Sequence, residues 1–206
     1  MENYLVIDFD PVLHEYRANG VRKPPVTWIL AKSGLCDFSF VEEEIRERAM
    51  ARGKSVHWML ELEDQGRLNY RTVPKMLRPY RKVWNEFKKN TGFVPILIEH
   101  RFVSSFGYAG TFDRYGEFPP TAIYLRGSHA LIDIKTGSVQ EWTKYQLAPY
   151  AVAKARTVQA AKTIRRIGVA LTPDGYKVKE FPASSLEHDF SVFMEGLRRT
   201  ECLIQQ

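Results

Sequence analysis

The chain has little cysteine and no long apolar run. Its 206 residues include two cysteines, Cys36 and Cys202, too few for a disulfide framework or for the four thiolates of an ordinary iron–sulfur cluster. No apolar stretch approaches the roughly 20 residues that span a bilayer, and the start, Met1-Glu2-Asn3-Tyr4, lacks a signal-peptide pattern. We therefore expect no membrane association, no iron–sulfur cluster and a cytoplasmic location.

Internal repeats, low-complexity segments and the Gly-x-x-x-x-Gly-Lys-Ser/Thr phosphate loop of helicases are absent from the sequence too. What the chain does have is a basic surplus, with 30 Lys and Arg against 24 Asp and Glu and a net charge of +6. A surplus of this sign favours a polyanionic partner. The length suits one well-buried domain, so we predict a single domain over 1–206.

Residues 1–35 predict an N-terminal appendage made of a hairpin and a short helix. Segments 5–9 and 14–18 are strand-like, and Asn19-Gly20 is a strong signal for a two-residue turn. The short helix is expected over 27–33, with its end at Gly34.

The core of the domain is expected over about 40–180 and begins with helices. Ser39 and Glu42 form a capping-box pattern before a long helix that ends near Gln65, and Gly53 could kink or split that helix. Pro74 opens a second helix, which ends at Thr91-Gly92.

The rest of the chain predicts strands and two more helices. In order, these are strands at 94–103, 108–115 and 130–134, a helix at 138–156, strands at 163–171 and 176–181, and a C-terminal helix at 184–206. Ser138 with Glu141, and Ser184 with Glu187, give capping-box patterns for the two helices. Without the Pro74 helix, the order is α-β-β-β-α-β, which predicts an α/β fold with a mixed central sheet flanked by helices.

Two carboxylates and an ammonium group stand on neighbouring predicted strands. Asp113 ends a Gly110-x-x-Asp113 segment, and Asp133-Ile134-Lys135 ends the following strand. Placed side by side, the two carboxylates would repel each other unless a cation neutralised them. Oxygen ligands of this kind suit Mg²⁺ or Mn²⁺.

The residues after Asp133 have separate expected roles. Alternation along a strand places Lys135 on the same face as Asp133, where it could orient an attacking water or stabilise charge on a phosphate. The side chain of Ile134 points to the other face, but its backbone carbonyl could reach the metal. A bound metal would lower the pKa of its water and neutralise a phosphoryl transition state.

Three further residues could belong to this site. His57 could ligate the same cation, or it could simply be hydrogen-bonded beside the core. Glu61, one turn along the helix, either supports His57 as an acceptor or is a plain surface charge. Glu99 either joins or supports the metal site, or pairs with Arg101 or another basic neighbour.

The helix after Asp133 carries candidate substrate contacts. Gln146 and Tyr150 share one face at spacing i,i+4, where they could meet a phosphate or base, or could pack in the core. Trp142 lies near the start of the same helix and could stack on unpaired bases or be buried. We also expect Lys144, together with Arg52 and Lys54 of the long helix, to bind the substrate.

Taken together, these motifs resemble the PD-(D/E)XK nuclease superfamily in its RecB-like branch. The matching elements, in the family's order, are Gly53-x-x-x-His57-x-x-x-Glu61, Gly110-x-x-Asp113, Asp133-x-Lys135 and Gln146-x-x-x-Tyr150. The N-terminal segment resembles, more loosely, small nucleases encoded by phages and prophages. Phe112 stands where the superfamily's name has proline.

The resemblance implies metal-dependent cleavage of DNA in a bacterial or phage-infected cell. It implies that His57, Asp113, Asp133 and the Ile134 carbonyl bind the metal, and that Lys135 completes the catalytic set. It also implies that Gln146 and Tyr150 position the DNA.

These expectations lead to a Mg²⁺- or Mn²⁺-dependent DNA exonuclease that acts on ends in recombination or phage DNA processing. One rival is a structure-specific endonuclease that cuts flaps or junctions, and another is a catalytically silent DNA-binding module of the same fold. A third is a metal protein that acts on a small phosphorylated substrate. A single-strand annealing protein is an expected recombination partner, and the oligomeric state stays open.

Overall fold

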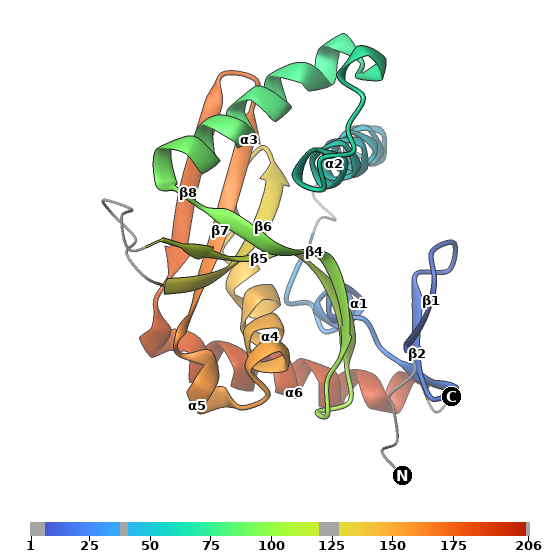
Figure 1. Ribbon diagram of the computed structural model, residues 1–206. Helices are drawn as coiled ribbons and strands as arrows, with labels where there is room; N and C mark the ends of the chain where they lie inside the picture. The colour runs from blue at the N-terminus through green and yellow to red at the C-terminus, as the bar shows by residue number, and fades with distance from the viewer. Residues whose placement is uncertain (1–6, 38–40, 120–127, 205–206) are drawn as a thin grey trace.

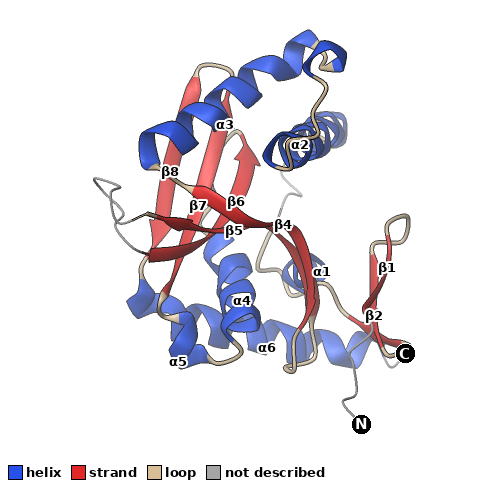
Figure 2. Cartoon of the chain, in the orientation of Figure 1, coloured by secondary structure: helices blue, strands red, loops and turns tan. Residues whose placement is uncertain are grey.

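A five-stranded sheet forms the middle layer of the molecule (Figures 1 and 2). The computed structural model describes residues 7–37, 41–119 and 128–204. The strands of this sheet, in spatial order, are β4 (Val94–Val103), β5 (Ala109–Phe118), β6 (Ser128–Thr136), β7 (Ile164–Thr172) and β8 (Gly175–Phe181).

The sheet is mixed. Strands β6 and β7 run parallel, whereas the pairs β4–β5, β5–β6 and β7–β8 are antiparallel. A parallel pair needs a long crossover, and α4 (Thr143–Ala155) and α5 (Val158–Ala161) supply it. The predicted mixed α/β sheet with flanking helices is therefore confirmed, and each of its predicted strands overlaps an observed one.

Helices cover both faces of the sheet (Figure 1). On one face lie α2 (Glu43–Asp64) and α3 (Arg78–Thr91), which are joined through the 3-10 turns η1 (Tyr70–Thr72) and η2 (Lys75–Leu77). On the other face lie α4, α5 and α6 (Leu186–Ile204), with α1 (Val26–Lys32) beside them. None of the helices in the described ranges combines the length and apolarity needed to cross a lipid bilayer.

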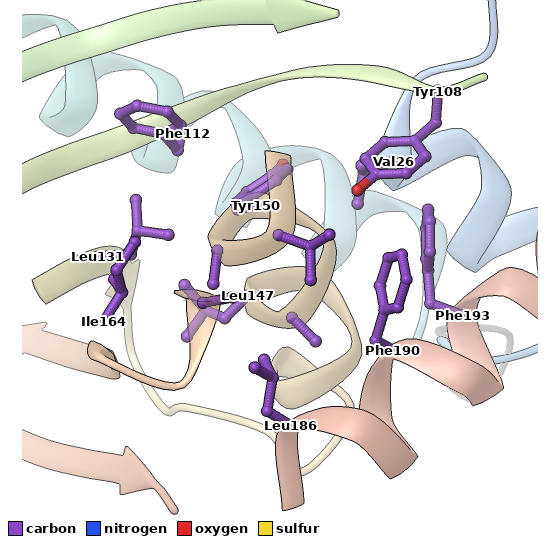
Figure 3. Packing of buried hydrophobic residues seen from close by; sticks show 14 of the residues in the cluster. Val26, Tyr108, Phe112, Leu131, Leu147, Tyr150, Ile164, Leu186, Phe190 and Phe193 are labelled. Carbon is purple, nitrogen blue, oxygen red and sulfur yellow. The ribbon is translucent and has the colours of Figure 1, made fainter. Parts of the chain in front are cut away.

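Two buried apolar clusters follow from the alternation of side chains along the strands. In β6, Leu131 packs with α4 and α6, whereas Ile132 and Ile134 pack with α2 and α3. Figure 3 shows the first cluster, in which Leu147 and Tyr150 of α4 lie between the sheet and α6. Asp133 and Lys135 share the parity of Leu131, so this pattern directs them toward α4.

The long helix α2 runs unbroken through Gly53, so this glycine does not split it. A Cβ atom at residue 53 would lie 3.6 Å from Oγ1 of Thr136, which places this part of α2 against the end of β6. The predicted ends of α2 and α3 are confirmed, because Gly66 and Gly92 follow them with φ of +68° and +72°, the left-handed conformation that glycine tolerates at helix ends.

The capping predictions are wrong or lie outside the described residues. Ser138 accepts a hydrogen bond from Gln140, Glu141 pairs with Lys179, and α4 begins only at Thr143, without a side-chain cap. Ser184 lies in the 3-10 turn η3 (Ala183–Ser185), ahead of α6. Ser39 falls in a stretch that is not described, and Glu42 at the start of α2 makes no side-chain cap.

The N-terminal unit is a three-stranded antiparallel sheet, one strand more than the predicted hairpin. Its strands are β1 (Ile7–Asp10), β2 (Glu15–Ala18) and β3 (Val21–Lys23). The expected turn at Asn19-Gly20 joins β2 to β3, with positive φ at both residues. Residues 5 and 6 of the predicted first strand lie outside the described ranges.

Candidate metal centre

Asp113 and the backbone of β6 meet where the pairing of β5 with β6 ends. The last residues in register there are Arg114 and Ile132. Beyond them, the Asp113 carboxylate accepts a hydrogen bond from the Ile134 backbone N–H, with Oδ2 at 2.6 Å from the nitrogen. A side-chain oxygen therefore replaces a backbone partner in the ladder, and this fixes Asp113 beside the Asp133-Ile134-Lys135 segment.

His57 of α2 reaches the same place from the other side of the strands. Its Nε2 donates to the Ile134 carbonyl at 2.8 Å. Its Nδ1 lies 3.6 Å from Oδ1 of Asp113 and 3.7 Å from Oε1 of Glu99. One ligand atom from each of His57, Glu99 and Asp113 can be chosen so that all lie within 4.8 Å of one another. These three residues could therefore hold one metal ion.

The charges of this cluster depend on each other. Burial opposes the protonation of His57, but Asp113 and Glu99 outweigh it and raise the pKa of His57 to about 9. Burial raises the pKa of Asp113, although the nearby His57 acts in the opposite direction. Without a metal, a protonated imidazole thus supplies the positive charge between the two carboxylates.

Asp133 and Lys135 form a second pair directly beside these residues. Nζ of Lys135 lies 2.9 Å from both carboxylate oxygens of Asp133. Burial raises the pKa of Asp133 to about 6, with Lys135 opposing the shift and Asp113 adding to it. Burial works against a charged Lys135, but Asp133 and Asp113 prevail and raise its pKa. Lys135 is therefore an ammonium group at neutral pH.

Lys135 also connects the site to α4. Its Nζ donates to Oε1 of Gln146 at 3.3 Å and lies 5.5 Å from the centre of the Trp142 ring. Gln146 in turn donates to the hydroxyl of Tyr150 at 3.4 Å. Both Gln146 and Tyr150 are buried, and Tyr150 packs edge-on against Phe102.

Glu99 enters the site with an unusual backbone. It lies on β4 between Ile98, which pairs with Arg114, and His100, which pairs with Phe112. The register is continuous across these pairs, yet Glu99 has φ of +45°. A non-glycine residue in this left-handed region costs about 1–3 kcal/mol and persists where its surroundings hold it.

Arg114 is the residue that holds Glu99. Its side chain is fully buried, and NH1 donates to Oε1 of Glu99 at 2.9 Å and to the Asp113 carbonyl at 2.6 Å. Nε donates to Oδ2 of Asp64 at 2.8 Å. Asp64 also accepts hydrogen bonds from Trp84 and Lys88 of α3.

The structure brings most of the predicted site residues together and leaves others apart. His57, Asp113, Asp133 and Lys135 converge, and Gln146 and Trp142 adjoin them. The Ile134 carbonyl, predicted to bind metal, here accepts the hydrogen bond of His57. Of its two predicted alternatives, Glu99 faces the site and pairs with a basic neighbour, which is Arg114 and not Arg101.

The remaining candidates lie around the site. Glu61, for which support of His57 and a plain surface charge were equal alternatives, accepts a hydrogen bond from Gln65. Arg52 and Lys54 are exposed on α2. Lys144 lies with Nζ 5.1 Å from the centre of the Tyr145 ring.

Sequence reasoning missed Arg114 and Asp64. A signal for Arg114 was present, because it lies in the strand-like run Phe112-Asp113-Arg114-Tyr115, where alternation gives it the parity of the apolar Phe112. An arginine at such a position is expected to be buried with a carboxylate partner. Asp64 gave no comparable signal, because it resembles an ordinary charge in the last turn of a helix.

The residues present fit a hard divalent cation. Carboxylate oxygens are suitable ligands for Mg²⁺ or Mn²⁺, and a neutral imidazole nitrogen is a common ligand of metal ions in proteins. Asp113 and Glu99 together raise the pKa of His57, so this cluster favours a positive charge beside its two carboxylates. A metal ion would take the place of the proton on Nδ1 of His57.

Comparison with known proteins gives weak similarities. No protein-family model and no curated protein sequence matches the chain. Among solved structures, it is similar to LHK-Exo in complex with dAMP, at 13% identity and a TM-score of 0.32 over 89% of this chain and 90% of that one. It is also similar to an alkaline exonuclease (LHK-Exo) from Laribacter hongkongensis, at 11% identity and a TM-score of 0.31 over 88% and 94%.

Proposed function

We propose that this chain is a divalent-metal-dependent DNA nuclease of the PD-(D/E)XK type, with an RecB-like arrangement of motifs. The observation that carries the proposal is the convergence of His57, Glu99 and Asp113 within 4.8 Å, beside a buried Asp133–Lys135 pair. These residues come from α2, β4, β5 and β6. Their order in the sequence matches the motifs that resemble this superfamily.

His57, Glu99 and Asp113 are the proposed metal ligands, and Asp133 is the adjacent carboxylate that completes the set. When bound, the ion would supply an activated water and neutralise charge on the phosphate. The Ile134 backbone orients two of the ligands, because its N–H donates to Asp113 and its carbonyl accepts from His57. Hydrogen bonds of this kind fix the orientation of a metal ligand and the tautomer of a histidine.

Lys135 acts as a hydrogen-bond donor in this proposal. Because Asp133 and Asp113 raise its pKa, it is an ammonium group at neutral pH. Its ammonium group can hold an attacking water by donating to the oxygen, or can stabilise charge that develops on the phosphate. Gln146 and Asp133 keep the ammonium group in place.

The exposed Arg52 and Lys54 of α2, with Lys144 of α4, are proposed to bind the DNA backbone, since contacts of this type supply most of the sequence-independent affinity for DNA. Trp142, next to Lys135, could stack on an unpaired base. The leading form is an exonuclease in recombination or phage DNA processing.

The test is cleavage of linear and circular duplex DNA by the purified chain in Mg²⁺, Mn²⁺ or a chelator. Degradation of linear DNA that requires metal and spares circles would support an exonuclease, whereas metal-dependent nicking of circles would support the endonuclease. Binding without cleavage in either metal would refute the proposal and favour the silent module. Asp174→Asn, which alters an exposed carboxylate in the β7–β8 turn, is the matched control and should retain full activity.

A further inference from the structure

We infer that Arg114, anchored by Asp64, is a positioning residue that sets the affinity of the metal centre through Glu99. This inference rests on the proposed metal site and extends it to two residues that do not themselves offer a ligand to the ion. The observations are the contacts of the Arg114 guanidinium, the burial of both anchoring residues and the backbone of Glu99.

The guanidinium of Arg114 joins three parts of the fold. It donates through NH1 to Glu99 at 2.9 Å and through Nε to Asp64 at 2.8 Å. Because Nε and NH1 are fixed in one plane, the position of Asp64 at the end of α2 determines the direction from which NH1 meets Glu99. A movement of α2 would therefore be transmitted to a proposed metal ligand on β4.

Asp64 is an anchor because its own carboxylate is saturated. It is fully buried and accepts hydrogen bonds from Trp84 Nε1 at 3.0 Å, from Lys88 and from Arg114. These donors come from α3 and β5, so Asp64 is held by two elements besides its own. Charge-assisted hydrogen bonds in a buried network are stronger than neutral ones and give a rigid arrangement.

Arg114 is not optimally satisfied by these contacts. Its NH2 is buried without a hydrogen-bond partner among the described residues. A buried, unsatisfied donor destabilises the folded state, so an arginine that served stability alone would gain from a different orientation. The observed orientation serves Glu99 and the Asp113 carbonyl instead.

The backbone of Glu99 explains why such support is needed. With φ of +45°, this residue would relax toward an ordinary extended conformation if nothing held its side chain. The ion pair with Arg114 holds the carboxylate 3.7 Å from Nδ1 of His57. Without Arg114, Glu99 would leave the ligand cluster.

The experiment is a double-mutant cycle on Mn²⁺ affinity, measured by the EPR signal of free Mn²⁺ and by the Mn²⁺-dependent shift in melting temperature. The variants are Arg114→Lys, Glu99→Gln and the two combined. Arg114→Lys should weaken Mn²⁺ binding by about 10-fold or more, the usual effect of losing a residue that orients a ligand. In the Glu99→Gln background, the same change should weaken binding by less than about 2-fold, because the path through Glu99 is already broken.

Arg166→Lys is the matched control. Arg166 is equally buried and is paired with Asp189 at 2.7 Å, but its partners lie on α6, on the β8–α6 connection and at the start of α4. This variant should lower the melting temperature and leave Mn²⁺ affinity unchanged. If Arg114→Lys does not fold, Asp64→Asn replaces it in the same cycle, with the same expected pattern.

The outcomes separate this inference from the proposed function. A wild-type chain that binds no Mn²⁺ would refute the metal centre itself. Wild-type affinity in folded Arg114→Lys, or an equal loss with and without Glu99→Gln, would overturn the positioning role while leaving the metal centre intact.

Discussion

Two buried arginines of the main sheet, on β5 and β7, differ in whether their carboxylate partners contact further charged residues. Arg166 of β7 donates to Asp189, to Ser185 and to the carbonyls of Pro182 and Lys144. None of these partners of Arg166 belongs to the proposed metal centre. Arg114 of β5 also bonds a buried aspartate, but its second carboxylate partner, Glu99, faces His57 and Asp113.

The difference lies in the balance of charge. Around Arg166 one cation faces one carboxylate. The Arg114 cluster continues to Glu99, which lies with Asp113 beside His57, and these two carboxylates raise the pKa of His57 to about 9. Loss of one partner of the Arg166–Asp189 pair would leave a buried charge uncompensated, whereas the carboxylates beside His57 favour an additional cation.

Breaking the Arg166–Asp189 pair should have the largest effect on stability. Asp189→Ala leaves Arg166 buried and unpaired, which we expect to lower the free energy of unfolding by about 3–5 kcal/mol. Denaturant titration measures this loss. The control Glu187→Ala removes an exposed carboxylate from the same helix and should cost less than about 1 kcal/mol. An Asp189→Ala variant as stable as the control would show that the two clusters do not differ in this way.

Removing a carboxylate from the metal centre should affect cleavage more than folding. Asp113→Ala removes a proposed ligand, which should lower the cleavage rate by about 1000-fold, equivalent to about 4 kcal/mol of transition-state stabilisation. Single-turnover cleavage of linear DNA in Mg²⁺ measures the rate, and circular dichroism checks the fold. A variant that cleaves at the wild-type rate would remove Asp113 from the site.

Lys135→Ala tests the donor beside the cluster. We expect a loss of about 100-fold in turnover, because one preorganised donor is removed, while Mn²⁺ affinity stays close to that of the wild type. Cleavage kinetics and Mn²⁺ titration of the same preparation separate the two effects. Full activity would refute the role assigned to Lys135, and a lost metal site would show that the lysine holds Asp133 in place.

The smallest effect should come from pH. The pKa of His57 is higher in the folded chain than its ordinary 6.5, so its contribution to stability is complete below about pH 6.5 and is lost as the pH rises through about 9. Metal binding displaces this proton, so Mn²⁺ affinity should increase over the same interval. Melting curves without metal from pH 6 to 9.5 should show the decline in the wild type, and His57→Ala should reduce it. An equal decline in both would contradict the assignment.

The sequence allowed the strands to be predicted better than the helix starts. Strand β4 was predicted over its observed residues, since its apolar content and flanking breakers are local properties. The capping box at Ser138 and Glu141 failed because Glu141 pairs instead with Lys179 of β8, a partner distant in sequence. A pattern of a few neighbouring residues cannot reveal a competing partner that is distant in the sequence.

The site shows the same limit. Asp113, Asp133 and Lys135 could be inferred because they stand in short motifs on predicted strands. Glu99 could be proposed only as one of two alternatives, because its role depends on a left-handed backbone and on Arg114. Neither feature has a signature within a few residues of position 99.

The residues of the proposed metal centre belong to strands that the sheet holds with different strength, because β4 lies at the edge of the main sheet and β6 in its interior. Asp133 and Lys135 belong to β6, an interior strand, and remain paired there with Gly168 and Ala170 of β7. Glu99 belongs to a strand with a single neighbour and a backbone kept away from its relaxed geometry. In the proposed metal centre, release of the ion would then begin with a displacement of β4, while β6 stays in register with β7.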